Sequence, residues 1–425
     1  MRLSPTTLSA DRHGRIVDIP GLLAAARTGR TVVPIDPSLL IPLPRGSTLY
    51  LLPGRTAVGY DTAGGPLQSL DSTAVAAFLP PGYTAAALAA FDRQPSAPML
   101  PLFCYCAVCW YRGRFHVPAV RVDTDPKHDG CDITPAKLRS LVKQRLGKHP
   151  GNRLLAHHGL VCALQYTCPN AVNLFLGRWE APVAVAGACN AACHGCISKR
   201  NTAAINPPQE RIGFTPTVDE IVDLAVPHLK RAPRAMISFG QGCEGEPLLR
   251  WKLIEEAIRA IRRETARGTL HVNTNGSKPE AIGRLAAAGL DSIRISLNSA
   301  RKDLYEAYYG CRRCSYSFDD VLEGFHAARK AGLWVSVNYL TFPGVTDDMR
   351  EHAAFARLLA AAKPDMIQWR NLNIDPDFYM KIVETAVPAG RTSCMGISAL
   401  IESLRRQFPS MRMGYFNPPV RSSGR

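Results

Sequence analysis

The sequence lacks the features that would place the chain in a membrane or outside the cell. Its first thirty residues carry several charges and show neither the apolar core nor the small-residue cleavage site of a signal peptide. No uninterrupted apolar run approaches the length that spans a bilayer. We therefore expect a cytoplasmic protein without a membrane partner. In that compartment thiols stay reduced, so the 13 cysteines are expected to be metal ligands, redox groups or core residues.

Acidic residues are scarce relative to basic ones. The chain has 35 Asp and Glu against 51 Lys and Arg, a formal net charge of +16. Such a charge attracts nucleic acid or phosphorylated substrates. The basic residues are dispersed, however, and no Lys/Arg block with interleaved aromatic residues is present. The charge thus also fits a sequence that is simply rich in arginine and alanine, and both interpretations stay open at this point.

Internal repeats and low-complexity segments are also absent, and 425 residues suffice for two or three globular domains. We expect an N-terminal α+β region of unknown role over residues 1–150, because short apolar runs there alternate with Pro and Gly. A helical lead-in should follow at 151–181, after a helix at 135–146. The main domain is expected at 182–375, and a short C-terminal extension with a helix at 396–408 should cover 376–425.

The main domain alternates short apolar runs with longer amphipathic stretches, the pattern of β/α units around a parallel sheet. The expected strands are 183–186, 235–239, 270–273, 292–297, 334–340 and 366–369. Right-handed crossovers would wind these units into an open barrel. The expected fold class is therefore α/β, with a partial (β/α)6 TIM-like barrel, the N-terminal α+β region and the C-terminal helical extension.

Three thiols follow the first expected strand directly: Cys189, Cys193 and Cys196, in the spacing CxxxCxxC. Closely spaced thiolates suit an iron-sulfur cube, and three ligands for four irons leave one iron open to an outside ligand. The alternative is a structural zinc site, for which His194 or Cys168 would supply the fourth ligand.

The thiol motif is followed by two further motifs at expected strand ends. They are Glu244-Gly-Glu-Pro247 after the second strand and Asn273-Thr-Asn-Gly276 after the third. Together the three motifs resemble those of the radical S-adenosylmethionine superfamily. The resemblance implies a 4Fe-4S cluster on the three cysteines, with S-adenosylmethionine on the open iron. It further implies reductive cleavage to a 5′-deoxyadenosyl radical, which abstracts hydrogen from an unknown substrate, and an electron donor such as flavodoxin or ferredoxin.

The same resemblance implies contacts to S-adenosylmethionine from residues at the carboxyl ends of the strands, where β/α barrels place their chemistry. These residues are Gly245, Glu246, Thr274, Asn275, Ser296, Asn298 and Asn338. Arg294, Ser296 and Asn298 alternate along one strand and so share one face, which in a barrel is the interior. On the sixth strand Gln368 or Arg370 is expected to reach the substrate, which is a small molecule, a peptide or RNA.

A second cysteine group lies in the N-terminal region. Cys104, Cys106 and Cys109 form CxCxxC, with Cys131 following, so a zinc site or a second cluster is one interpretation. These thiols also lie in an alternating apolar stretch, where they would be buried strand residues. The abundant cysteines and the positive charge leave one rival for the whole chain, a zinc-stabilised nucleic-acid-binding protein.

Overall fold

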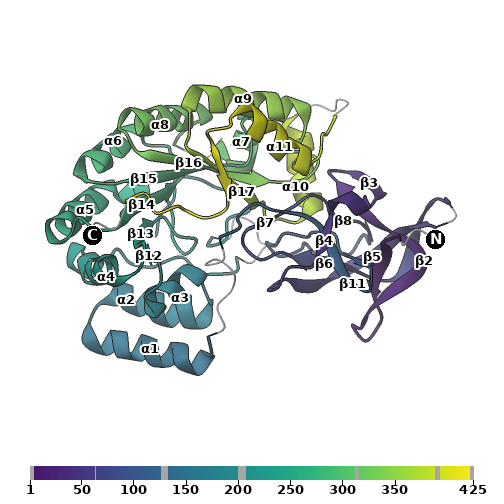
Figure 1. Ribbon diagram of the computed structural model, residues 1–425, viewed down its shortest axis with the longest axis horizontal. Coiled ribbons are helices and arrows are strands. Elements are labelled where there is room, and N and C mark those ends of the chain that lie inside the picture. The colour runs from purple at the N-terminus through teal and green to yellow at the C-terminus, as the bar shows by residue number, and fades with distance from the viewer. Residues whose placement is uncertain are drawn as a thin grey trace.

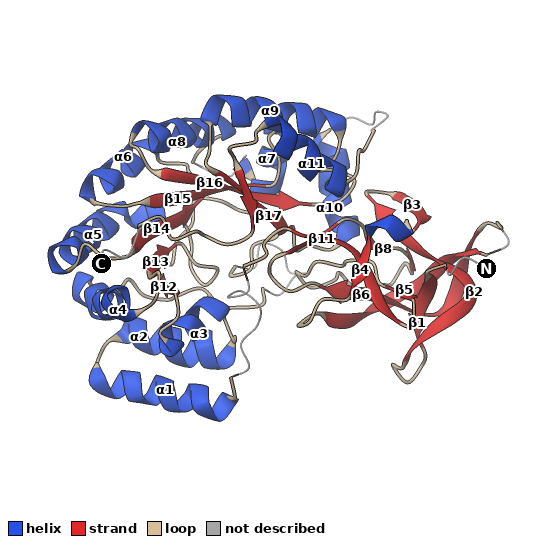
Figure 2. Ribbon diagram, in the orientation of Figure 1, coloured by secondary structure: helices blue, strands red, loops and turns tan. Residues whose placement is uncertain are grey.

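The computed structural model describes residues 4–62, 64–125, 133–199, 207–311, 315–387 and 393–421. The chain forms two regions with different architecture, joined by a group of helices. The N-terminal region consists almost entirely of strands, whereas the rest alternates strands and helices (Figure 2). Among the described residues no helix is both long and apolar enough to cross a membrane.

The N-terminal region is one antiparallel sheet of eleven strands. Two of its long strands, β5 and β6, form a hairpin whose register shifts at bulges. This sheet is more regular than the expected irregular region. Its strands are β1 (Thr6–Ala10), β2 (Ile16–Thr28), β3 (Thr31–Pro34), β4 (Leu40–Pro42), β5 (Thr48–Asp61), β6 (Leu67–Phe78), β7 (Tyr83–Ala85), β8 (Leu88–Ala89), β9 (Phe91–Arg93), β10 (Cys109–Tyr111) and β11 (Arg114–Arg121), with the short helix η1 (Pro37–Leu39) between β3 and β4.

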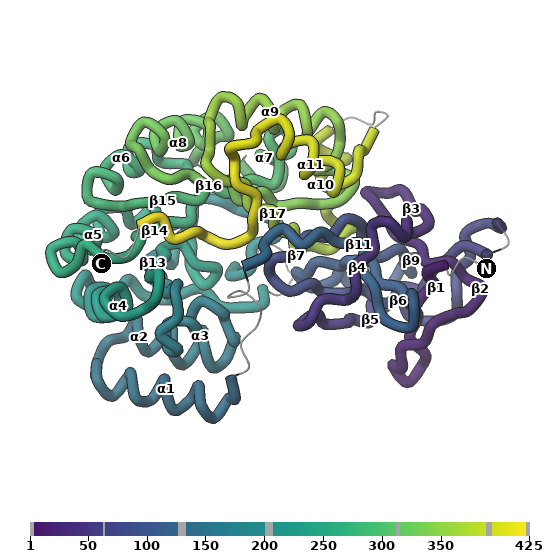
Figure 3. Tube along the Cα trace, viewed as in Figure 1, coloured from purple at the N-terminus to yellow at the C-terminus, as the bar shows by residue number. Residues whose placement is uncertain are grey.

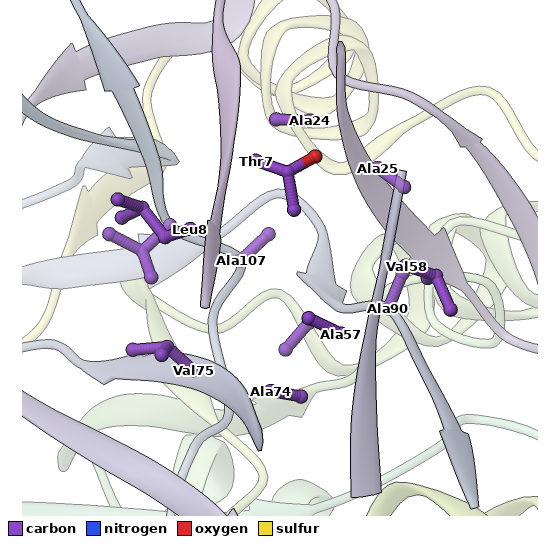
Figure 4. Close-up of a pocket in the computed structure, with 12 residues that line it drawn as sticks. Thr7, Leu8, Ala24, Ala25, Ala57, Val58, Ala74, Val75, Ala90 and Ala107 are labelled. Carbon is purple, nitrogen blue, oxygen red and sulfur yellow. The ribbon is translucent and has the colours of Figure 1, made fainter. Parts of the chain in front are cut away.

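A small cavity lies among the strands of the N-terminal sheet (Figure 4). Its lining is formed mainly by alanine and valine side chains, together with Thr7 and Leu8. The volume is ≈ 20 Å³, which is room for about one water molecule. The cavity is therefore a packing gap between small residues and is too small for a substrate.

Helices connect the two regions: α1 (Pro135–Lys148), α2 (Arg153–Ala156), the π-helix η3 (His157–Gln165) and α3 (Pro169–Leu176). The Thr134 side chain accepts a hydrogen bond from the Lys137 amide and so caps α1, which has Pro135 in its first turn. Asn152 caps α2 in the same way, through the Leu155 amide. The helix expected at 135–146 is α1, and the helical lead-in expected at 151–181 contains α2, α3 and between them a π-helix that the periodicity did not indicate.

The second region is a seven-stranded parallel sheet in the order β12-β13-β14-β15-β16-β17-β18. Six of the strands correspond to the six expected ones, and β18 is an additional strand in the C-terminal extension. The strands are β12 (Glu180–Val183), β13 (Met236–Phe239), β14 (Thr269–Thr274), β15 (Ser292–Leu297), β16 (Trp334–Thr341), β17 (Met366–Asn371) and β18 (Arg412–Gly414).

Helices line the outer side of this sheet, so that the strands lie inside an arc of helices (Figure 1). The strand residues are buried from both sides, as is typical of a parallel sheet covered by its crossover helices. The helices are α4 (Val218–Arg231), η4 (Pro247–Arg250), α5 (Trp251–Glu264), α6 (Pro279–Ala288), α7 (Lys302–Tyr309), α8 (Phe318–Lys330), α9 (Met349–Ala362), α10 (Pro376–Ala386) and α11 (Ile397–Gln407).

The C-terminal tail crosses the amino-terminal end of the parallel sheet (Figure 3). Asn417 donates to the buried Glu180 at the start of β12. The Val420 amide donates to Thr269 at the start of β14, and Arg421 pairs with Asp291 just before β15. The tail therefore closes this end of the sheet and leaves the carboxyl end for the site.

The N-terminal sheet docks against the carboxyl end of β17. The Thr84 hydroxyl donates to the Trp369 carbonyl (2.9 Å), and the Asn371 side chain accepts a hydrogen bond from the Ala85 amide (2.8 Å). Beyond β17, Arg55 and Asp375 form an ion pair of 2.9 Å whose side chains are 0% and 3% exposed. The N-terminal region is thus fixed to the same end of the parallel sheet that carries the expected site.

Candidate active site

Cys189, Cys193 and Cys196 lie in the loop that follows β12, and all three are half-buried. The end of α7 holds this loop through its backbone carbonyls. The Ala192 amide donates to the Tyr309 carbonyl (3.0 Å), and the His194 amide donates to the Tyr308 carbonyl (3.1 Å). The loop conformation is therefore fixed by main-chain hydrogen bonds on both sides of Cys193.

At least two of the three thiol sulfur atoms lie more than 4.8 Å apart. In the described part of the chain, one group of three His, Cys, Asp or Glu residues has its ligand atoms all within 4.8 Å of one another, and these thiols do not belong to it. Thiolates on three irons of a cube lie farther apart than thiolates on one zinc ion. The His194 ring, moreover, packs edge-on against Phe378. The arrangement thus fits a cluster better than the alternative zinc site.

The surroundings of the thiols bear on their ionisation. Burial raises the pKa of the Cys189 thiol to about 11, and the Ala191 amide that donates to its sulfur acts in the opposite direction. The Arg211 guanidinium donates to the Cys196 sulfur (3.5 Å). A bound metal deprotonates coordinating thiols outright. Three thiols of this kind on one loop can therefore hold a cluster.

Glu246, Thr274 and Asn275 come from two neighbouring strand ends and are hydrogen-bonded to one another. The Thr274 hydroxyl and the Asn275 amide both donate to the Glu246 carboxylate, which also accepts from the Leu248 amide. Burial raises the pKa of Glu246 to about 7, and these three donors act against the rise. The carboxylate therefore ties the turn after β14 to the loop after β13, beside any contact to a ligand.

The turn after β14 also reaches the thiol loop. The Asn275 side chain donates to the Asn190 side chain (2.8 Å), which in turn donates to the Ser277 hydroxyl (2.8 Å). Asn190 directly follows Cys189 in the thiol motif. The structure thus brings the ends of β12, β13 and β14 together through side-chain hydrogen bonds. Asn190 was not among the expected site residues, although its place inside the motif was a usable signal.

Gly245 lies where the loop after β13 packs against residues 186–188, which precede Cys189. Its amide donates to the Ala186 carbonyl (2.6 Å), and the Glu246 amide donates to the Ala188 carbonyl (3.0 Å). A Cβ at Gly245 would lie 1.8 Å from the Ala188 carbonyl oxygen. Only glycine therefore allows the two backbones to approach this closely.

Glu244 stands where the Gly-Gly-Glu-Pro motif of the superfamily that the chain resembles has its first glycine, and it has a structural role. Its carboxylate accepts hydrogen bonds from four backbone amides, two from the end of β12 and two from the loop after β13: Val185, Ala186, Gly240 and Gln241. Burial raises the pKa of Glu244 to about 7, and the four amides act against the rise. The substitution thus holds the two loops together.

Two amide side chains at the inner face of β15 and β16 carry buried oxygen atoms without a partner. Asn338 donates to the Ser296 hydroxyl (2.9 Å), and its own Oδ1 is buried and accepts no hydrogen bond from the described residues. Asn298 donates to the Leu304 carbonyl and the Tyr379 hydroxyl, and its Oδ1 is in the same state. A buried acceptor without a donor is costly unless a ligand supplies one, so both oxygens suit ligand hydroxyl groups.

The two residues expected to reach a substrate, Gln368 and Arg370, contact other side chains of the protein. Gln368 accepts a hydrogen bond from Arg294 (3.1 Å) and donates to Asn417 of the tail (3.0 Å). Arg370 lies over the ring of Tyr415. Burial lowers the pKa of Arg294 to about 9. The tail thus engages this part of the interior, an arrangement that the sequence did not indicate.

The N-terminal cysteines form no metal site among the described residues. Cys104, Cys106 and Cys109 are fully buried, and the thiols of Cys106 and Cys109 donate to backbone carbonyls. Burial raises the pKa values of all three thiols, those of Cys104 and Cys109 to about 12. The three thiols are therefore buried residues, of which Cys109 lies in strand β10 and Cys106 in an isolated bridge. Cys131 lies outside the described residues.

Comparison with known proteins matches the part of the chain that carries this site. A family model, the Radical SAM superfamily, matches residues 183–356. GTP 3′,8-cyclase of Streptomyces coelicolor is 31% identical over 207 residues, which cover 48% of this chain and 51% of that protein. FeMo cofactor biosynthesis protein NifB of Azotobacter vinelandii is 29% identical over 237 residues, which cover 52% of this chain and 41% of that protein. The chain thus spans about half the length of the curated relatives that it matches, or less.

The solved structures that match this chain are distant in sequence. Methylornithine synthase (PylB) is 17% identical with a TM-score of 0.38, and the match covers 67% of this chain and 75% of that chain. The structure named native anSMEcpe with bound AdoMet is 13% identical with a TM-score of 0.35, over 45% of this chain and 52% of that chain.

Proposed function

Because residues 183–356 form a radical SAM domain, we propose that the chain is an enzyme that reductively cleaves S-adenosylmethionine and abstracts hydrogen from a substrate. Proteins of this superfamily use a 4Fe-4S cluster and S-adenosylmethionine. When bound, the reduced cluster supplies the electron that converts S-adenosylmethionine to the 5′-deoxyadenosyl radical. The chain itself contributes the residues that hold, orient and enclose these groups.

One observation carries the proposal. Three half-buried thiols lie on a loop after β12 that is hydrogen-bonded to the turn after β14 through Asn190 and Asn275. The same loop is hydrogen-bonded to the loop after β13 through the Ala188 carbonyl and the Glu246 amide. Cys189, Cys193 and Cys196 are the proposed ligands of the cluster. The carboxyl ends of parallel strands are where α/β sheets bind their ligands.

The expected contacts to S-adenosylmethionine divide into two groups. Gly245, Glu246, Thr274 and Asn275 form the hydrogen-bonded network next to the thiol loop, and we propose that its backbone groups orient the methionine part. Ser296, Asn298 and Asn338 form the second group. The unpartnered amide oxygens of Asn298 and Asn338 support ribose hydroxyl groups as their partners.

We further infer that the seven parallel strands form the wall of an incomplete barrel, with the site at its carboxyl end. The domain division at 1–150, 151–181, 182–375 and 376–425 is part of the proposal, as are a cytoplasmic location and a flavodoxin or ferredoxin as electron donor. The N-terminal sheet docks at the end of β17, beside the proposed site. This position supports a role of the N-terminal region in substrate selection, for a small molecule, a peptide or RNA.

The proposal is tested by reconstituting the full chain anaerobically with iron and sulfide. Dithionite and S-adenosylmethionine are then added, and 5′-deoxyadenosine is quantified by chromatography. We expect about four irons per chain in a cube and formation of the nucleoside. A fully loaded cluster that yields no 5′-deoxyadenosine contradicts the proposal.

Two variants make the test specific to the three thiols. Replacing Cys189, Cys193 and Cys196 by alanine should abolish both the cubane Mössbauer signal and the nucleoside. The matched control is Cys394→Ala, which removes an exposed thiol outside the loop and should change neither. A cubane that survives the triple substitution contradicts the ligand assignment.

A further inference from the structure

A second group of metal-ligating side chains lies outside the proposed active site. His157, Cys162 and Cys243 have their ligand atoms all within 4.8 Å of one another. Both thiols are buried, at 2% and 6% exposure, and the histidine is half-buried. The group joins the connecting helices to the loop after β13, two parts of the chain that are about 80 residues apart in sequence.

The distance between the two sulfur atoms matches a shared metal ion. Two thiolates bound to one tetrahedral zinc ion at about 2.3 Å are about 3.8 Å apart. The sulfur atoms of Cys162 and Cys243 are 3.7 Å apart, and both cysteines are free thiols. A disulfide would need a separation of about 2.05 Å. The pair is thus placed for a common ligand and not for a covalent bond.

The histidine completes the ligand set with an unsatisfied nitrogen. The His157 Nε2 atom is buried and makes no hydrogen bond of regular geometry to the described residues, and the Cys243 thiol lies beside the ring. A buried ring nitrogen without a partner is costly, and zinc coordination would satisfy it. The buried thiols of Cys106 and Cys109 donate to backbone carbonyls, whereas the Cys162 thiol donates to the Cys243 sulfur.

The π-helix explains how two of the ligands reach the same side. His157 and Cys162 are five residues apart in η3. In an α-helix a spacing of five residues turns the second side chain roughly 140° away from the first. A π-helix has i→i+5 hydrogen bonds and so brings residues five apart close to the same face. Such segments are rare and occur frequently at functional sites, which agrees with a ligand site here.

We propose that His157, Cys162 and Cys243 bind one zinc ion, with Cys168 as the fourth ligand. The Cys168 amide donates to the Cys162 carbonyl (2.8 Å), so the residue lies beside the group, but its sulfur is not within 4.8 Å of all three ligand atoms and would have to turn toward the ion. Three thiolates and one imidazole form an ordinary structural zinc site. The ion would anchor Cys243, whose neighbour Glu244 bridges the loops after β12 and β13. The site is separate from the proposed cluster and does not depend on the proposed reaction.

The test is zinc analysis of the full-length protein as purified, by elemental analysis and by X-ray absorption at the zinc edge. This edge reports zinc alone, so iron in the cluster does not interfere. We expect about one zinc per chain, with sulfur ligands at about 2.3 Å and one nitrogen at about 2.0–2.1 Å. A protein without stoichiometric zinc, zinc without sulfur ligands, or a Cys162–Cys243 disulfide overturns the proposal.

Variants assign the ligands. Cys162→Ser and Cys243→Ser should each lose most of the zinc, and Cys168→Ser should lower the affinity for zinc in a chelator competition. The matched control Cys394→Ser should keep the full zinc content. An unchanged zinc content in both Cys162→Ser and Cys243→Ser refutes the site, and an unchanged affinity in Cys168→Ser refutes the fourth ligand. If the variants are insoluble, the absorption spectrum of the wild-type protein decides alone.

These readouts are independent of S-adenosylmethionine. A protein that contains sulfur-bound zinc and forms no 5′-deoxyadenosine supports the zinc site and contradicts the proposed function. A protein that forms the nucleoside and contains no zinc supports the proposed function and contradicts the zinc site.

Discussion

The two regions of the molecule differ in how their cores are built. The parallel region has one continuous apolar cluster that runs from the connecting helices to α11, whereas the N-terminal sheet has three small separate clusters. Only a few N-terminal residues join the large cluster, Ala86, Leu88 and Leu102 among them. A small core buries less apolar surface and stabilises its fold less. The N-terminal sheet should therefore depend on its docking to the parallel region.

The regions also differ in what their polar side chains do. At the carboxyl ends of the parallel strands, Glu244 and Glu246 are buried and hold neighbouring loops together. In the N-terminal region the most deeply buried charge is Arg55, and it pairs across the interface with Asp375. Buried polar groups thus shape the site in one region and fix the docking in the other.

Removing the buried ion pair should give the largest effect. In Asp375→Ala, Arg55 is left buried without its partner, and α10 also loses its N-cap bonds to the Asp377 and Phe378 amides. Breaking such a pair costs about 3–5 kcal/mol. We expect urea unfolding, monitored by circular dichroism and by tryptophan fluorescence, to show an early transition of the N-terminal sheet.

The control for this prediction is an exposed pair at the same interface. Arg30 and Glu384 are bonded at 2.7 Å with side chains 48% and 51% exposed. Glu384→Ala should therefore change the free energy of unfolding by at most about 1 kcal/mol. Equal losses in the two variants would show that the buried pair does not determine the docking.

Replacing Gly245 by alanine should disturb the backbone of the parallel region at the candidate active site. The new Cβ would lie 1.8 Å from the Ala188 oxygen and 2.4 Å from the Ala188 carbonyl carbon, both backbone atoms that cannot rotate away. Gly245→Ala should lower the free energy of unfolding by about 1–3 kcal/mol. It should also reduce the iron retained after reconstitution, because the displaced segment leads directly to Cys189.

The matched control is Gly283→Ala in α6, where a Cβ meets no atom within 4 Å. A helix-interior glycine replaced by alanine should stabilise by about 0.5–1 kcal/mol and leave the iron content unchanged. Full iron retention in Gly245→Ala would contradict the requirement for close backbone approach.

Sequence periodicity predicted the parallel region well, because each strand and each helix there carries its own apolar pattern. Helix α6 (Pro279–Ala288), for example, is bounded by Pro279 and by Gly289 in a left-handed conformation. The first strand was placed three residues late, because β12 starts at the buried Glu180. Strand β18 was missed, since three residues that pair at a sheet edge have no periodicity to recognise.

The candidate site was predictable only in part. The motifs gave the residues at the strand ends, and the hydrogen bonds from Thr274 and Asn275 to Glu246 join them as a group. The role of Glu244 was not predictable, because its four partners are backbone amides that any sequence supplies. The proximity of Cys162 to Cys243 was also hidden, since it depends on packing between segments far apart in the chain.

The free energy of unfolding should depend on pH through the ionisation of Glu244. Its pKa in the folded protein is about 7, raised by burial above the ordinary value of 4.5. Between these values the folded state binds more protons than the unfolded state, so the free energy of unfolding falls as the pH rises. One proton contributes at most about 1.4 kcal/mol per pH unit. From about pH 5 to about pH 8 the melting temperature should therefore fall less in Glu244→Gln than in the wild-type protein.

The control is Glu256→Gln, which removes an exposed carboxyl group from α5. Its pH dependence should follow that of the wild-type protein. If Glu244→Gln and the wild-type protein lose equal stability between the two pH values, Glu244 does not take up the proton.

Replacing the N-terminal thiols should have the smallest effect on metal content. This result would distinguish them from the cysteines that we propose as metal ligands in the rest of the chain. Cys104 and Cys106 lie in one apolar cluster and Cys109 in another, and burial raises their pKa values so that they stay protonated at neutral pH. Replacing all three by alanine should cost about 1 kcal/mol per thiol in urea unfolding, because each loses one buried sulfur. Iron, zinc and 5′-deoxyadenosine formation should equal the wild-type values, whereas Cys162→Ser loses zinc. A loss of either metal in the triple variant would give these thiols a ligand role and remove the difference between the regions.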